Sequence, residues 1–125
     1  MKADVILFEA GVRHPDETAS VLRAGIETAE RSEARQWRAV LLARIEFGLG
    51  DEPTDLLTLD VTTEDGTPIG EKTPMEIEAP RVPGAMTVIV KVNLWLLRTG
   101  TLGMVLRNRK APLWERTLEV LDAGR

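Results

Sequence analysis

Hydrophobic and polar residues alternate along most of the chain after position 36. In the clearest run, from Gln36 to Phe47, every second residue starting with Trp37 is apolar. Successive side chains of a β-strand point to opposite faces, so this pattern predicts a long strand with one buried face. The other face changes from apolar to charged towards its end, at Arg44 and Glu46.

The same alternation predicts several further strands. They are a strand containing Leu57 to Thr62, then Met75 to Ala79, Ala85 to Leu97, Thr101 to Arg107, and Leu113 to Leu121. Asp65-Gly66 is a strong turn dipeptide, because glycine adopts positive φ without strain. Thr67 to Ile69 would begin a return strand, which Pro68 restricts to a sheet edge. The register of the last strand stays open, because Trp114, Leu118 and Val120 offer one apolar face and Leu113 and Leu121 another.

The predicted strand from Ala85 to Leu97 is apolar on both faces. Its main face runs from Met86 to Leu96, and its second face carries the candidate interface residues Ile89, Trp95 and Leu97. A strand of this kind is either covered on both sides or part of an interface. Tryptophan is enriched in the energetically dominant parts of interfaces. Core and interface both remain open for this second face.

The segment from Glu17 to Arg35 has no clear strand pattern. Its alanine, glutamate and arginine content favours a short helix that Asp16 could cap. Gly25 lies in its middle and weakens that interpretation, so a strand interrupted at Gly25 is the alternative.

A sequence of features along the chain resembles a known family. These features are Ala3, Asp4 and Gly11 around a first strand, Gly25-Ile26, Glu46-Phe47 after the long strand, Asp65-Gly66, and Gly100 before a final hairpin. In this order they resemble a family of small, uncharacterised bacterial proteins expected to be all-β sandwiches. The chain departs from that family at Gly100-Thr101-Leu102, where an aromatic residue usually follows the glycine. The resemblance implies a fold and no activity, and it favours strand and loop for residues 17–35.

The expected fold is therefore an all-β, two-layer antiparallel sandwich, immunoglobulin-like, with about seven to nine strands. We expect residues 1–125 to form a single domain. The chain of 125 residues, 43% of them hydrophobic and 29% charged, is long enough to bury a core.

Composition excludes several classes of function. Cysteine is absent, which excludes disulfides, thiolate metal sites and cysteine nucleophiles. The net charge of −4 makes binding to nucleic acid unfavourable. No apolar run approaches the roughly 18 residues of a membrane span, and the first residues lack the pattern of a signal peptide. The expected location is therefore the cytoplasm.

Candidate catalytic and metal-binding residues are few. His14, the only histidine, precedes a proline and is expected in an exposed loop without a catalytic partner. Acidic residues cluster at 51–55 and 60–65, where loops of a sandwich can hold calcium. Turns and solvated strand faces explain these acids more simply, and no phosphate-binding glycine motif occurs. We therefore expect no catalytic residue, no metal site and no cofactor.

Two basic stretches could meet an acidic partner. Arg107, Arg109 and Lys110 form a basic turn, and Arg31, Arg35 and Arg38 form a second stretch. A charged turn that keeps a sheet edge soluble is the simpler interpretation.

These observations predict a non-enzymatic interaction or structural module that self-associates or belongs to a larger assembly. The expected partner is a protein or a second copy of the chain. A small-ligand or carbohydrate-binding sandwich that uses tryptophan and loop acids is the alternative, and an enzyme with a cleft around His14 comes third.

Overall fold

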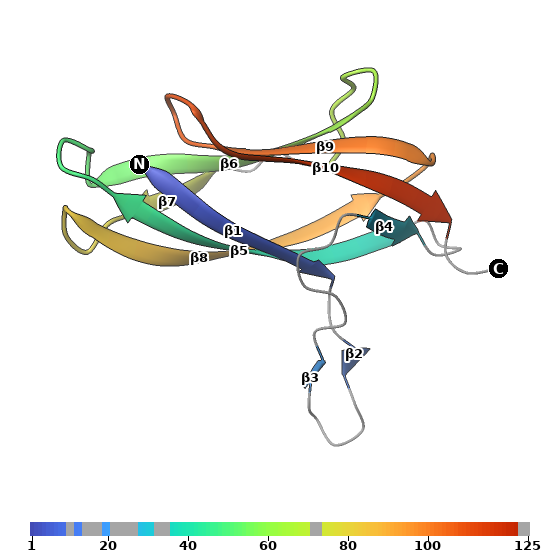
Figure 1. Cartoon of the computed structure of the whole chain (residues 1–125), viewed down its shortest axis with the longest axis horizontal. Helices are drawn as coiled ribbons and strands as arrows, with labels where there is room; N and C mark the ends of the chain where they lie inside the picture. Colours follow the sequence, from blue (N-terminus) through green and yellow to red (C-terminus); the bar gives the residue numbers. More distant parts are fainter. Residues whose placement is uncertain (10–11, 14–18, 21–27, 32–35, 71–73, 123–125) are drawn as a thin grey trace.

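A computed structural model describes residues 1–9, 12–13, 19–20, 28–31, 36–70 and 74–122. In this part of the chain every regular element is a β-strand, so the all-β prediction is confirmed (Figure 1). The strands are β1 (Lys2–Glu9), β2 (Val12–Arg13), β3 (Ala19–Ser20), β4 (Thr28–Arg31), β5 (Gln36–Phe47), β6 (Thr54–Thr63), β7 (Met75–Glu78), β8 (Gly84–Trp95), β9 (Gly100–Arg107) and β10 (Pro112–Asp122).

Two sheets face each other as the layers of a sandwich (Figure 1). The three-stranded sheet has the order β1-β5-β8, and the five-stranded sheet has the order β4-β10-β9-β6-β7. Neighbouring strands are antiparallel except β4, which pairs in parallel with β10. Strands β2 and β3 form a separate short ribbon. The predicted two-layer sandwich is confirmed, while an immunoglobulin-like topology stays a prediction.

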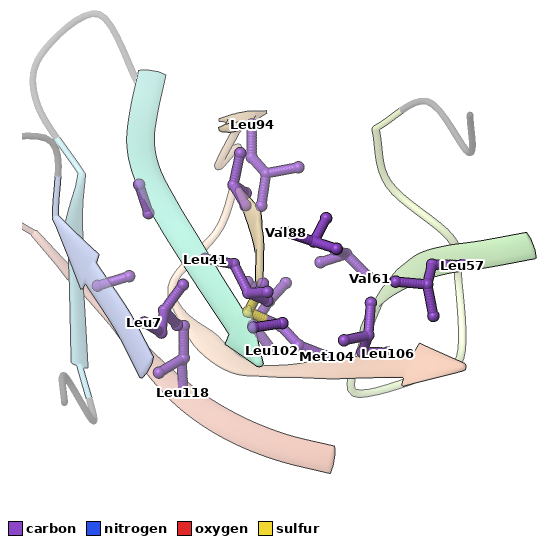
Figure 2. Close-up of a cluster of buried hydrophobic side chains, with 14 of the residues drawn as sticks. Leu7, Leu41, Leu57, Val61, Val88, Leu94, Leu102, Met104, Leu106 and Leu118 are labelled. Atoms are coloured by element: carbon purple, nitrogen blue, oxygen red, sulfur yellow. The ribbon is translucent and has the colours of Figure 1, made fainter. Parts of the chain in front are cut away.

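The core lies between the two sheets and follows the alternation of the sequence. Along β5 every second side chain from Trp37 to Phe47 is buried. Figure 2 shows Leu7 and Leu41 of the three-stranded sheet and Met104 and Leu118 of the five-stranded sheet in this interior. On one side of the sandwich β1 contacts β10, so the layers close there.

The final hairpin settles the register that the sequence left open. Leu118 lies opposite Leu102 and both are buried, whereas Leu121 is exposed. Trp114 pairs with Leu106, and a register shift between Pro112 and Trp114 accommodates Leu113. The face that contains Trp114, Leu118 and Val120 is therefore the inward one.

Two turns show why particular residues occur where they do. At the predicted Asp65-Gly66 turn, Gly66 has φ of 84° and its N–H donates to the Thr63 carbonyl at 2.9 Å. The predicted return strand at Thr67 to Ile69 is reduced to one bridge, between Thr62 and Pro68. The Thr63 N–H donates to the Thr67 carbonyl and the Ile69 N–H donates to the Val61 carbonyl, both at 2.9 Å, so pairing with β6 on either side of Pro68 does not need the N–H that proline lacks.

The connection into β8 brings two backbone segments very close together. A Cβ atom on Gly84 would lie 2.5 Å from the carbonyl oxygen of Arg81. Only glycine fits at this position without a shift of the backbone.

The segment predicted as either helix or strand contains strand where it is described. Ala19–Ser20 belongs to β3 and Thr28–Arg31 to β4. The remainder of 17–35, with Gly25-Ile26, lies outside the described residues, so a short helix is neither confirmed nor excluded there.

Candidate functional site

The outer face of the three-stranded sheet carries a row of large apolar side chains. Ile6, Leu42 and Ile89 lie directly opposite one another on β1, β5 and β8, and we call these three residues the apolar row. Ile6 is 50% exposed and Ile89 61% exposed, while Leu42 is half-buried between them. In the next row, Phe8 and Val40 are also half-buried, and the third member is the exposed Lys91. Exposed contiguous apolar surface of this kind marks interaction sites.

Charged side chains flank the apolar row along β5. Arg38 lies four residues before Leu42, and Glu46 lies four residues after it. Arg44 Nη1 donates to Glu46 Oε1 at 2.6 Å within the same strand. The outer face of β5 is therefore basic at one end, apolar in the middle and mixed in charge at the other end.

The outer face of the five-stranded sheet has a different character. Its cross-strand rows run from β6 across β9 to β10 as Asp60, Val105 and Glu115, and as Thr62, Gly103 and Thr117. Arg107 Nε lies 2.8 Å from Asp60 Oδ2 on this surface. The two outer faces of one sandwich thus differ: one is mainly polar, with Val105 and Leu121 as apolar members, and the other presents the apolar row.

The three candidate interface residues do not form one patch. Ile89 belongs to the apolar row, whereas Trp95 and Leu97 lie at the end of β8, 62% and 65% exposed. Both line a cleft of about 380 Å³ with the turn at 63–67 and the segment 98–102, which we call the end cleft. The sequence left core and interface open for this face; the exposures place the three side chains outside the core, and an interface role stays a prediction.

Polar groups in the end cleft are held by local hydrogen bonds. Asp65 accepts from the Thr63 hydroxyl and from the Thr67 N–H at 3.1 Å. These hydrogen bonds, that from the Thr63 side chain first, lower the pKa of Asp65 to about 2. Glu64 Oε1 accepts from the Thr101 N–H at 2.7 Å. Both carboxylates already serve the turn and the start of β9, and Asp65 stays ionised near neutral pH.

Asp51 and Asp55 of the predicted clusters also have structural partners. Asp51 accepts from the Gly48 N–H at 2.6 Å and lies 3.0 Å from the Met1 ammonium, and the Gly48 bond is the larger cause of its lowered pKa. Asp55 Oδ1 accepts from the Arg109 N–H at 3.1 Å. Within the described ranges no group of three or more such side chains could hold a metal ion.

The basic turn is part of the β9–β10 hairpin. Asn108 Oδ1 accepts from the N–H groups of Lys110 and Ala111, both at 2.8 Å, which fixes the turn. Arg107 pairs with Asp60, so its charge is partly compensated, while Arg109 and Lys110 are exposed. Of the stretch with Arg31, Arg35 and Arg38, Arg35 lies outside the described residues, as does His14.

A second hollow, of about 700 Å³, lies between β8 and the edge formed by β6 and β7. Its walls include core residues such as Leu57 and Leu94 and outward residues of β8, among them Ile89 and Trp95, and it also borders Gly70 and Pro74. Gly70 and Pro74 flank residues outside the described part of the chain, so we assign no site there.

The chain matches no protein-family model, no curated protein and no solved structure. The resemblance noted in the sequence is thus supported only in its expected all-β fold. No described helix has the length and hydrophobicity needed to cross a membrane.

Ile6, Phe8 and Leu42 were not among the surface candidates predicted from the sequence. Their signal is a run of four apolar residues, Val5 to Phe8, which on a strand must place two side chains on each face. Leu42 gives the same signal, because it stands on the outer face of a strand whose other face already fills the core.

Proposed function

We propose that this protein is a non-enzymatic interaction module that binds a second copy of itself through the outer face of the three-stranded sheet. The observation that carries the proposal is the contrast between the two outer faces. The five-stranded sheet presents mainly threonine, glycine and charged residues, with Val105 half-buried and Leu121 39% exposed among them, whereas the three-stranded sheet presents the apolar row. A covered apolar row would lose contact with water, which is the main driving force of protein association.

The size of this face determines how strong the association is expected to be. Twelve residues of β5, at about 3.3 Å each, and three strands about 4.8 Å apart give a footprint of roughly 500–600 Å² per copy. Two copies would bury about 1,100 Å² in total, at the lower limit for a specific interface. We therefore expect a weak, concentration-dependent dimer.

Replacing Ile89 with aspartate is expected to weaken self-association by about tenfold or more. The new carboxylate would be buried without a partner against apolar side chains, which costs more than about 1.4 kcal/mol. Because Ile89 is exposed in the isolated chain, the variant should remain folded. Sedimentation velocity over a wide range of protein concentrations measures the change.

Thr117→Asp is the matched control, since it introduces the same charge at an exposed position on the outer face of the five-stranded sheet. It should leave self-association unchanged. A wild-type protein that stays monomeric at the highest concentration, or equal effects of the two variants, would overturn the proposal.

The end cleft favours a second candidate function, the binding of a small carbohydrate. The exposed ring of Trp95 borders a cleft whose wall includes an ionised carboxylate, Asp65, and the side chains of Thr63 and Thr99. Sugars combine apolar faces that pack on aromatic rings with hydroxyls that donate to carboxylates.

Titration with a panel of monosaccharides and disaccharides, followed by NMR chemical shifts, tests this second candidate. We expect shifts at residues of the end cleft, lost in Trp95→Ala and retained in Ile89→Ala, which alters a residue outside it. A panel without shifts in the wild-type protein would reject the carbohydrate function.

A further inference from the structure

The charges on β5 restrict how two copies can meet. Its outward positions, in order along the strand, are Arg38, Val40, Leu42, Arg44 and Glu46. Two identical chains that meet through the same face are related by a twofold axis. This axis lies in the plane midway between the three-stranded sheet of one copy and the three-stranded sheet of the other. Each choice of axis brings a different set of these charges together.

Two positions of the axis are electrostatically unfavourable. An axis parallel to β5 would place every residue of this strand opposite itself, so that Arg38, Arg44 and Glu46 each face a like charge. An axis across the strands between Val40 and Leu42 would place Arg38 opposite Arg44 of the second copy. Like charges facing each other at an interface oppose association.

An axis across the strands over Leu42 gives complementary charges instead. It places residue 38 of one copy opposite residue 46 of the other, because both are four residues from Leu42. On the basis of the proposed self-association, we infer that the two copies meet about this axis, with Arg38 of each facing Glu46 of the other. The pair occurs twice in the dimer by symmetry.

The same axis also packs the apolar row against itself. Leu42, Ile6 and Ile89 lie in one cross-strand row, so each faces its own counterpart in the second copy. Packed sheets lie about 10 Å apart and cross at about 30°, and Arg38 and Glu46 lie about 13 Å from the axis. Both side chains are long and exposed enough to meet at this offset.

Neither Arg38 nor Glu46 forms an ion pair with another strand among the described residues; Glu46 pairs with Arg44 on its own strand.

A charge exchange tests this arrangement. Arg38→Glu and Glu46→Arg should each weaken the dimer by about tenfold, because two contacts become repulsive in each case. The double variant restores opposite charges and should associate within about threefold of the wild-type protein. Sedimentation velocity at low salt measures all of them, since exposed ion pairs weaken as salt rises.

Lys91→Glu is the matched control, because it changes the net charge as Arg38→Glu does. In the inferred arrangement Lys91 faces Thr87 of the second copy, so the dimer should hardly change. A dimer that neither single variant weakens, or that the double variant does not restore, overturns the arrangement but leaves the self-association proposal standing. A monomeric wild-type protein overturns both.

Single cysteines provide an independent measurement, because the chain has none of its own. A cysteine in place of Leu42 should join to its counterpart with a short bismaleimide linker, since both lie at the axis. A cysteine in place of Arg38 should not, because the two copies of residue 38 would be about 26 Å apart. Equal yields at the two positions would overturn the inferred axis.

Discussion

Replacing Leu41 with alanine is expected to lower the free energy of unfolding by about 2–5 kcal/mol. Leu41 is 0% exposed and lies in the middle of β5, inside the core cluster shown in Figure 2. The truncated side chain would lose its packing and leave a cavity that a two-layer core closes only partly. Urea unfolding followed by tryptophan fluorescence measures the loss.

Leu42→Ala is the control for this prediction, because the two residues are neighbours on opposite faces of one strand. At protein concentrations where the chain is monomeric, Leu42→Ala should cost about 1 kcal/mol or less, since the side chain is only half-buried. If Leu41→Ala does not fold, Leu41→Met should, with a loss below about 1.5 kcal/mol. Equal losses for both alanine variants would contradict the assignment of inner and outer faces.

Replacing Gly84 with alanine is expected to destabilise the protein by about 1–3 kcal/mol. The added Cβ would lie 2.5 Å from the Arg81 carbonyl oxygen, which is backbone and cannot turn aside as a side chain could. The start of β8 would have to shift, and with it the pairing of Gly84 with Phe47. Thermal unfolding should show a melting temperature several degrees lower, about 4 °C for each kcal/mol in a chain of 125 residues.

Gly48→Ala is the matched control for the glycine substitution. A Cβ at Gly48 would meet its nearest neighbour, Asp51 Oδ2, at an ordinary 3.6 Å, and the residue does not have positive φ. Its melting temperature should stay close to that of the wild-type protein. A Gly84→Ala variant as stable as Gly48→Ala would show that the close approach to Arg81 relaxes without cost.

The alternation of hydrophobic and polar residues predicted the long strands, because it follows directly from the burial of one face of each strand. The predicted run from Gln36 to Phe47 coincides with β5, and the predicted Ala85 to Leu97 differs from β8 by only one or two residues at each end. Turn chemistry was equally informative at Asp65-Gly66, where positive φ is required. These features depend on a residue and its close neighbours in the sequence, so a single sequence contains them.

Strand partners could not be predicted in the same way. The parallel pairing of β4 with β10 joins Thr28 to Glu119, which are far apart in the chain and carry no local signal for each other. The apolar row could not be predicted for the same reason. Its three residues, Ile6, Leu42 and Ile89, become neighbours only through the registers of β1, β5 and β8. Of the apolar row, only Ile89 was predicted from the sequence. That prediction grouped Ile89 with Trp95 and Leu97, which line the end cleft in the structure.

The polar outer face of the five-stranded sheet has a consequence for the size of the assembly. A face that binds the same face of a second chain is fully occupied in the dimer. Assembly beyond a dimer needs a second association surface elsewhere on the chain. The opposite layer offers Asp60, Thr62, Thr117 and their polar neighbours in that position. Association through the apolar row should therefore end at a closed pair of chains and not extend into a filament.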